Sequence, residues 1–193
     1  MNLPNQLTVS RLALTVLFVA ALSSSWRFGN TAGLLIFAAA GITDYYDGAI
    51  ARRRNLVSAF GQLMDPLADK VMMAAAFILL VPEHAFPAWV AVVIVSREFA
   101  ITGLRLLAAN QGHILPAENM GKHKMIWQII TIVYFLLLLA IRELTPLSAA
   151  GAELWWRQAW TLGGTTLIVV TLALTLYSGC GYLWKNRALI IPA

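Results

Sequence analysis

Long apolar segments alternate with short polar segments along the whole chain, and this pattern predicts membrane-spanning helices. The apolar runs are continuous, whereas strands of a membrane barrel would alternate apolar and polar residues with a period of two. A helix needs roughly 20 apolar residues to cross a bilayer, so the 193 residues have room for about six spans. The expected spans are residues 7–22, 31 to beyond 44, 60–81, 87 to beyond 105, 121–141 and 160–183. We therefore predict an all-α integral membrane protein with six transmembrane helices, forming a single domain over residues 1–193.

The composition supports this prediction and excludes two other classes of protein. Hydrophobic residues make up 60% of the chain and charged residues 12%, whereas ordinary soluble domains carry about 25% charged residues. Intrinsic disorder needs low hydrophobicity and high charge. A disulfide scaffold needs paired cysteines, and Cys180 is the single cysteine. A signal peptide is disfavoured for the first apolar run, because Ser23-Ser24-Ser25 lacks the usual small-residue cleavage pattern.

The positions of the basic residues predict an orientation with both chain termini in the cytoplasm. With the N-terminus inside, only Arg27, Arg142 and Arg157 of the 14 lysines and arginines fall on the outer side, as the positive-inside rule requires. Tryptophans such as Trp26 and Trp89 fall at the expected outer ends of spans, where indole rings favour the headgroup region. The net charge of +5 does not indicate a nucleic-acid partner, because the basic residues border spans and face anionic lipid headgroups.

All four aspartates of the chain lie in one stretch, at Asp44, Asp47, Asp65 and Asp69. The first pair is spaced i, i+3 on the second expected helix and the second pair i, i+4 on the third, so each pair shares a helix face. A short loop carrying residues 52–54 makes these helices antiparallel neighbours, and the two pairs can face each other. Four such carboxylates repel one another and are costly to desolvate unless cations neutralise them. Oxygen-only ligands favour one or two hard ions, Mg²⁺ or Mn²⁺, over zinc.

Pro66 allows two descriptions of the third helix. Asp65 could be its N-cap with Pro66 at the first helical position. Alternatively Ser58 caps the helix and Pro66 lies inside it, with a kink. The stripe formed by Gly61, Asp65 and Asp69 favours the second description. Gly61 itself could admit a flat ligand or a neighbouring helix, and both interpretations stay open.

The segment Asp44-Tyr45-Tyr46-Asp47-Gly48-Ala49-Ile50-Ala51-Arg52, followed by Gly61, Asp65 and Asp69, resembles the signature of the CDP-alcohol phosphotransferase family. Eight positions at fixed spacing over residues 44–69 make this signature specific. Residues 5–12, 64–70, 96–98 and 103–105, and the segment around Lys122, Lys124 and Gln128, extend the likeness to one branch of the family. The acceptor alcohol in that branch is glycerol 3-phosphate.

The resemblance implies an enzyme that transfers the phosphatidyl group of CDP-diacylglycerol to glycerol 3-phosphate. It implies a homodimer in the bacterial inner membrane, a site open to the cytoplasm, and two divalent ions, Mg²⁺ or Mn²⁺. Carried over by position, Asp44, Asp47 and Asp65 are expected to hold the metals, and Asp69 is expected to act as general base and further metal ligand. The residues expected to contact CDP-diacylglycerol are Thr8, Ser10, Gly48, Arg52, Ser58 and Gly61.

Four basic residues of the fourth and fifth expected spans are candidates for binding the acceptor phosphate: Arg97, Arg105, Lys122 and Lys124. An intramembrane arginine is costly and by default indicates a function, and a guanidinium group suits bidentate phosphate contacts. Two alternatives remain. Arg97 could form a structural pair with Glu98 or an aspartate, and Lys122 and Lys124 could serve topology alone.

Two other functions fit parts of the sequence. A sister enzyme with another acceptor (phosphatidylglycerol, inositol phosphate or serine) would share the aspartates. An ion or proton transporter would also carry intramembrane acids. A transporter should spread its polar groups through the bilayer or show paired broken helices, whereas these aspartates cluster near one side. The basic residues favour a phosphorylated acceptor.

Overall fold

The computed structural model describes residues 3–54, 59–112, 115, 119–145 and 150–187. Side chains are described for these residues except 3–8, 44–54, 59–66, 69, 119–120 and 150. All regular secondary structure within these ranges is helical. The elements are α1 (Leu3–Ser23), α2 (Gly29–Arg54), α3 (Ala59–Leu80), α4 (Ala88–Asn110), α5 (Asn119–Leu144), α6 (Ala150–Gln158), the π-helical segment η1 (Ala159–Gly163) and α7 (Gly164–Lys185).

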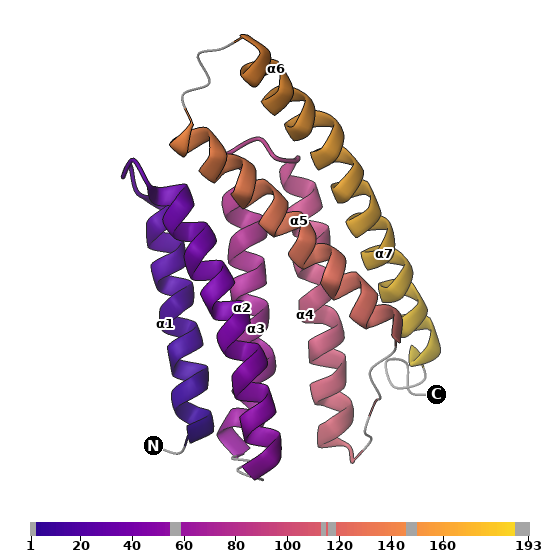
Figure 1. Ribbon diagram of the computed structural model, residues 1–193. Coiled ribbons are helices and arrows are strands. Elements are labelled where there is room, and N and C mark those ends of the chain that lie inside the picture. The colour runs from indigo at the N-terminus through magenta and orange to yellow at the C-terminus, as the bar shows by residue number, and fades with distance from the viewer. Residues whose placement is uncertain (1–2, 55–58, 113–114, 116–118, 146–149, 188–193) are drawn as a thin grey trace.

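The last three elements follow one another without a break and form one long helix, so the described chain has six helical rods, as predicted (Figure 1). Two stretches of the described chain are long and apolar enough to cross a membrane, Gly121–Leu144 and Gly151–Lys185. The apolar parts of three other helices are shorter: Val9–Ser23, Gly29–Thr43 and Lys70–Leu80. The number of helices is therefore confirmed, and six membrane crossings stay a prediction.

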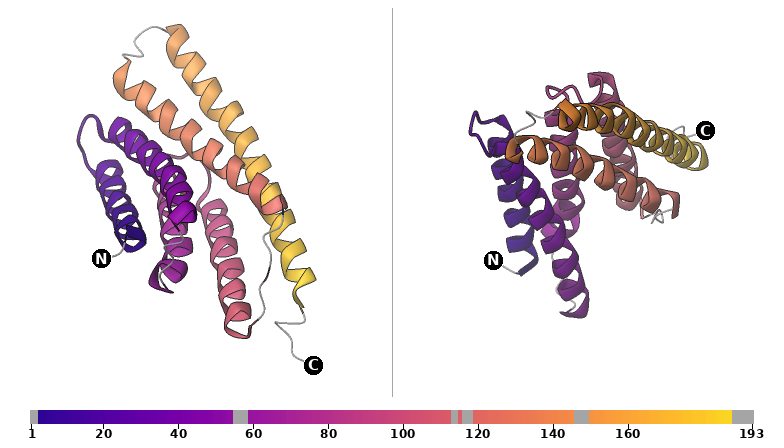
Figure 2. Two further views of the ribbon diagram at one scale, coloured as in Figure 1. Left: turned by 60° about the horizontal axis from the view of Figure 1, so that its bottom comes forward. Right: turned by 45° about the horizontal axis from the view of Figure 1, so that its top comes forward.

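The rods run alternately up and down, and the two chain ends lie at the same end of the bundle (Figure 1). Helix α1 packs against α2 and α3, and α5 lies against both α2 and α7. Helix α4 packs between α3 and α7, and Figure 2 shows α5 beside the long C-terminal helix on one side of the molecule. This arrangement brings α3, α4, α5 and α7 together in the half of the bundle near the termini.

An aromatic core fills the opposite half. Phe18, Phe77, Phe86 and Phe135 are all buried, and they come from α1, α3, the α3–α4 connection and α5. The rings of Phe77 and Phe135 each lie 5.9 Å, centroid to centroid, from the ring of Phe86. Trp160 of η1 adds an edge contact to Phe135 at 5.0 Å. Such ring pairs add to the apolar area that the helices bury, so this half holds most of the apolar packing.

The carboxylate of Glu143, in the last turn of α5, caps the start of α2. Its Oε1 accepts a hydrogen bond from the backbone N–H of Asn30 at 2.7 Å, and Oε2 accepts from the backbone N–H of Thr31 at 2.8 Å. The hydroxyl of Thr31 donates to the same Oε2 at 2.7 Å. The first N–H groups of a helix lack intrahelical partners and carry partial positive charge. A carboxylate accepts their hydrogen bonds and is attracted by that charge. The contact fixes α2 at the end opposite its aspartates.

Three boundary predictions were wrong. Residues 52–54, expected in a loop, belong to the last turn of α2, and residues 55–58 lie outside the described ranges. Glu143 and Glu153, which lie between the expected spans 121–141 and 160–183 and were therefore expected in a loop, belong to helices α5 and α6. Polarity suggested loops there, but Ala, Leu, Glu and Arg are strong helix formers. The pair between Glu153 and Arg157, 2.8 Å apart at i, i+4, supports α6.

The description of the third helix with Asp65 as N-cap was also wrong. Helix α3 already begins at Ala59, so Pro66 lies inside it. The alternative cap, Ser58, lies outside the described residues. The helix thus continues through the proline, as the shared stripe of Gly61 and the two aspartates favoured.

Candidate functional site

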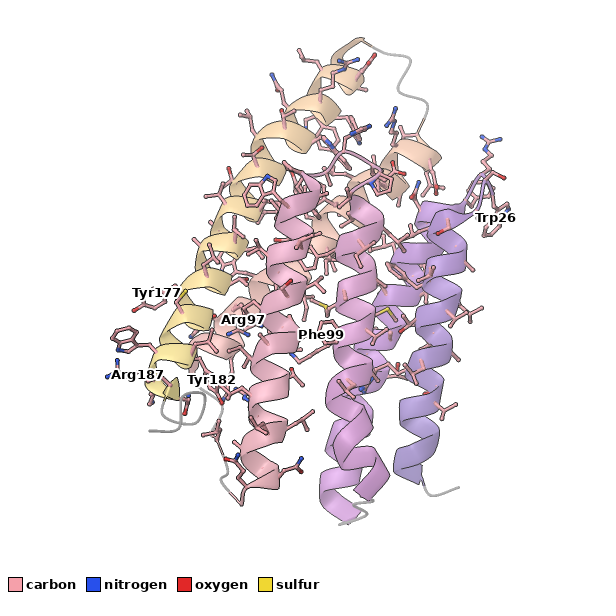
Figure 3. The ribbon with its side chains drawn as sticks, turned by 180° about the vertical axis from the view of Figure 1, so that it is seen from behind. Trp26, Arg97, Phe99, Tyr177, Tyr182 and Arg187 are labelled. Carbon is pink, nitrogen blue, oxygen red and sulfur yellow. The ribbon has the colours of Figure 1, made fainter. Side chains whose placement is uncertain are left out.

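A pocket of about 300 Å³ lies between α3, α4, α5 and α7. Figure 3 shows two of its residues, Arg97 and Tyr182, in the space between α4 and α7. The described side chains that line it include five cations and one carboxylate: Lys70, Arg97, Arg105, Lys122, Lys124 and Glu98. The pocket therefore carries a clear excess of positive charge and suits an anionic ligand.

The carboxylate of Glu98 on α4 is the shared partner of three of these cations. The Lys70 Nζ donates to Oε2 at 2.6 Å, Lys124 Nζ donates to Oε1, and Arg97 Nη1 lies 3.4 Å from the same Oε1. The Glu98 side chain is 11% exposed and that of Lys124 is 5% exposed. A buried charge is tolerated only when it is paired. Glu98 therefore allows three cations from α3, α4 and α5 to meet in a protected site.

The two arginines of α4 are both held by α7. Arg97 Nη2 donates to Ser178 Oγ at 3.1 Å, and Arg105 Nε donates to Tyr182 Oη at 3.1 Å. The Arg105 guanidinium carbon also lies 5.1 Å from the centroid of the Tyr182 ring, within cation–π range. Eight residues of helix separate the two arginines, which is about 12 Å of rise and a little over two turns. They therefore lie on one side of α4, facing α7.

The four basic residues predicted to bind the acceptor phosphate all line this one pocket. Arg97 and Lys124 are 27 positions apart in the sequence, and the packing of both α4 and α5 against α7 brings them together. The alternative pairing of Arg97 with Glu98 is also present. The two interpretations are compatible, because Arg97 contacts Glu98 while its side chain remains part of the pocket lining. Binding of phosphate stays a prediction.

The residues predicted for metal and nucleotide binding fall where side chains are mostly not described. Three groups are placed by helix alone: Asp44, Asp47, Gly48 and Arg52 in α2, Gly61, Asp65 and Asp69 in α3, and Thr8 in α1. Ser10 lies on an exposed part of α1, and Ser58 lies outside the described residues. Lys70 follows Asp69 directly on α3, so the described pocket begins beside the end of the aspartate signature.

The chemistry of the aspartate signature fits a hard divalent ion, because its four side chains offer only carboxylate oxygens. Elsewhere, no group of three His, Cys, Asp or Glu residues gathers among the side chains that the structure describes. The described pocket is cationic and does not itself suit a metal. The residues suited to a metal ion and the residues suited to an anionic ligand therefore lie in two neighbouring regions, the acidic signature and the cationic pocket.

Sequence reasoning missed several residues of the site. Glu98 was expected as part of the family resemblance and as one possible partner of Arg97, but not as the shared partner of three cations, and the buried hydroxyl groups of α7 were not singled out. Four of them, Thr171, Thr175, Ser178 and Tyr182, are all buried. Their spacing of four, three and four residues places them on one helix face. Polar groups on one face of a long apolar helix usually contact a neighbouring helix, and this pattern was the available signal.

A cationic pocket beside a carboxylate-rich signature has the chemistry to bind phosphorylated ligands together with divalent ions, and the comparisons with known proteins identify the family. The chain belongs to the CDP-alcohol phosphatidyltransferase family, whose family model matches residues 1–177.

Within that family it is similar to proteins named CDP-diacylglycerol–glycerol-3-phosphate 3-phosphatidyltransferase. The protein of that name from Bacillus subtilis is 38% identical, with 96% of this chain and 95% of the relative aligned. Those of Rickettsia bellii and Treponema pallidum are 31% and 32% identical, with 94% and 95% of this chain and 93% and 88% of each relative aligned.

Proposed function

We propose that the protein transfers the phosphatidyl group of CDP-diacylglycerol to glycerol 3-phosphate, forming phosphatidylglycerophosphate and releasing CMP in phospholipid biosynthesis. The observation that carries this proposal is the similarity, along 96% of the chain, to the Bacillus subtilis enzyme named for these two substrates. The cationic pocket adds a second argument from the structure. Its positive charge suits an acceptor that carries a phosphate group. Serine has no phosphate group and would not need this charge.

The acceptor phosphate binds among Arg97, Arg105, Lys122 and Lys124. A phosphate monoester is close to a dianion at neutral pH, and guanidinium groups bind its oxygens in pairs. The pocket of about 300 Å³ is at the small end of ligand sites, which fits glycerol 3-phosphate better than a whole phospholipid acceptor. Lys70 and Glu98 keep the neighbouring cations in place.

The acidic signature performs the transfer. Asp44, Asp47 and Asp65, with Asp69, hold two divalent cations, Mg²⁺ or Mn²⁺, which neutralise the charge of the donor pyrophosphate when bound. Thr8, Ser10, Gly48, Arg52, Ser58 and Gly61 hold CDP-diacylglycerol. Asp69 accepts the proton of the acceptor hydroxyl, whose oxygen attacks the phosphorus that bears diacylglycerol. The bond from that phosphorus to the bridging oxygen breaks, and CMP leaves. General-base help of this kind is worth about 10²–10⁴-fold.

The substrates and charge distribution support a location in the bacterial inner membrane, with six spans and the active site facing the cytoplasm. CDP-diacylglycerol is itself a membrane lipid, and Arg97 and Tyr182, which line the pocket, lie in the half of the bundle that holds the start of α1 and the end of α7 (Figures 1 and 3). The excess of basic residues at that end favours the cytoplasmic side. The protein acts as a homodimer in this proposal, as the family resemblance implies.

The product of the reaction tests the proposal directly. Purified protein is incubated with CDP-diacylglycerol and, separately, glycerol 3-phosphate, inositol phosphate, serine or phosphatidylglycerol, and the lipid products are identified by mass spectrometry. We expect phosphatidylglycerophosphate and CMP with the first acceptor only. A product formed only with another acceptor would assign the chain to a sister enzyme, and no product with any of them would refute the transferase proposal.

A further inference from the structure

We propose that the last two turns of α7 position the arginines of the acceptor pocket, with Ser178, Gly179 and Tyr182 as the positioning residues. The inference rests on the proposed function, because these residues act through the acceptor site. All three lie beyond residue 177, where the match to the family model ends. These residues therefore contribute to the acceptor pocket although they lie outside the part of the chain that the family model covers.

Arg97 lies against α7 at Ser178 and Gly179. Ser178 is 4% exposed. Its Oγ accepts a hydrogen bond from Arg97 Nη2 at 3.1 Å and lies 3.3 Å from the backbone oxygen of Thr175, to which the hydroxyl donates. That donation leaves the hydroxyl lone pairs for the guanidinium group. The hydroxyl is thus oriented by its own helix to hold one end of Arg97.

Gly179 provides the room for the stem of Arg97. A Cβ atom at position 179 would lie 2.9 Å from Arg97 Cγ and 3.2 Å from Arg97 Nε, closer than packed atoms tolerate. The clash involves the stem near the backbone, so the side chain would have to leave its present rotamer. Arg97 Nε is buried and has no hydrogen-bond partner within the described part of the chain. Packing against Gly179 therefore fixes this part of the side chain.

Tyr182 holds the second arginine. Its side chain is 3% exposed and packs with Ile101 and Leu104 of α4. Its hydroxyl oxygen accepts from Arg105 Nε at 3.1 Å while its ring lies below the guanidinium carbon. The hydrogen bond to Tyr182 involves Nε of Arg105. The two terminal nitrogens of the same guanidinium group are therefore the ones proposed to bind two phosphate oxygens.

Both arginines are long side chains that would otherwise sample many rotamers. Holding them from α7 before the ligand arrives reduces the entropy lost on binding. The effect concerns the acceptor, because neither arginine is assigned to the lipid donor. Changes in α7 should therefore alter the KM for glycerol 3-phosphate and leave the KM for CDP-diacylglycerol unchanged.

The first test compares two glycines of the same helix. We expect Gly179→Ala to raise the KM for glycerol 3-phosphate about tenfold. The added Cβ atom would displace Arg97, and the loss of one hydrogen bond between Arg97 and the phosphate has an effect of this size. Gly181→Ala is the matched control, because a Cβ atom there would meet no atom within 4 Å. It should leave both KM values unchanged. Thermal unfolding in detergent checks that both variants are folded.

The second test uses variants that add no atoms to the packed interface. Ser178→Ala and Tyr182→Phe each remove one hydroxyl that accepts from an arginine, and each should raise the acceptor KM about three- to tenfold. Tyr177→Phe is the control for the tyrosine, because Tyr177 is 71% exposed. The positioning role of α7 is refuted if Gly179→Ala, Ser178→Ala and Tyr182→Phe all leave the acceptor KM no higher than in the control variants.

A double-mutant cycle separates positioning from a general structural effect. In an Arg97→Ala background, Gly179→Ala should cause no further rise in the acceptor KM. A full additional tenfold rise would show that Gly179 does not act through Arg97, and would overturn the inference. If Arg97→Ala alone leaves the acceptor KM unchanged, the proposed acceptor site itself is wrong, and this outcome is distinct from failure of the α7 inference.

Discussion

Lys70 of α3 donates a hydrogen bond of 2.6 Å to Glu98 of α4. Lys70 follows Asp69, the last residue of the aspartate signature, and Glu98 contacts two further cations of the pocket. The pair therefore connects the helix that carries the proposed general base to the helix that carries the two arginines proposed to bind the acceptor. Because both substrates must meet at one phosphorus atom, the relative position of α3 and α4 is critical for the transfer.

Replacing Glu98 with glutamine should destabilise the pocket. The change leaves Lys70, Arg97 and Lys124 without their shared counter-charge, and uncompensated buried charge costs about 3–5 kcal/mol. We expect a lower Tm in detergent, partly restored by millimolar glycerol 3-phosphate, because a bound dianion replaces the missing charge. Glu153→Gln is the control, since its ion pair on α6 is exposed and worth little. A Glu98→Gln protein as stable as the wild type would contradict the central role of this carboxylate.

Replacing Asp69 with asparagine should abolish turnover. The amide keeps nearly the same size but does not accept a proton at neutral pH, so the loss should reach at least about 10²-fold. Binding of CDP-diacylglycerol, measured by isothermal titration in detergent, should largely survive. A variant that loses binding together with turnover would argue against the general-base assignment.

Removing divalent metal should stop the reaction. Treatment with EDTA should abolish activity, and added Mg²⁺ or Mn²⁺ should restore it, because the carboxylates of the signature suit these ions. Zinc should restore little, since the signature contains no cysteine or histidine. Full activity in metal-free buffer would refute the metal assignment of the four aspartates.

Replacing Arg105 with alanine should weaken acceptor binding selectively. Loss of a charged contact to phosphate should raise the KM for glycerol 3-phosphate by about 10- to 100-fold, with a smaller change in the KM for CDP-diacylglycerol. Arg157→Ala is the control, because Arg157 is exposed on α6 at the other end of the molecule. An unchanged acceptor KM would refute a role of Arg105 in binding the acceptor phosphate.

Replacing Glu143 with alanine should lower stability with little effect on either KM. The change leaves the first N–H groups of α2 without their carboxylate acceptor, which costs about 1–2 kcal/mol. Thermal unfolding in detergent measures the effect, and Glu83→Ala, at an exposed site in the α3–α4 connection, is the control. Equal Tm values for the two variants would show that the cap contributes nothing measurable.

The sequence was sufficient to predict the number of helices and four of the five cations that line the pocket. Continuous apolar runs have few alternatives to helices, and an arginine inside an apolar run, such as Arg97, is costly and by default indicates a function. The clustering of these cations could then be expected, although the distances could not.

The role of α7 could not be predicted in the same way. Serine, glycine and tyrosine are ordinary residues in an apolar helix, and their spacing indicates a buried face without naming the partner. The contact between Gly179 and Arg97 depends on how closely α4 approaches α7, which is set by the packing of the whole bundle. Residues 150–158 fell between the expected spans because the segment is polar, yet it is helical, since Ala, Leu, Glu and Arg are strong helix formers.

The excess of cations over the single carboxylate among the described pocket residues also has a kinetic consequence. A field of one sign in a narrow, weakly solvated opening attracts small multivalent anions from solution and speeds their encounter with the protein. That attraction declines as ionic strength rises, since about 0.15 M salt screens charges beyond about 8 Å. Capture of the soluble substrate would therefore depend on the salt concentration of the surrounding solution, whereas delivery of the lipid substrate by lateral diffusion would not.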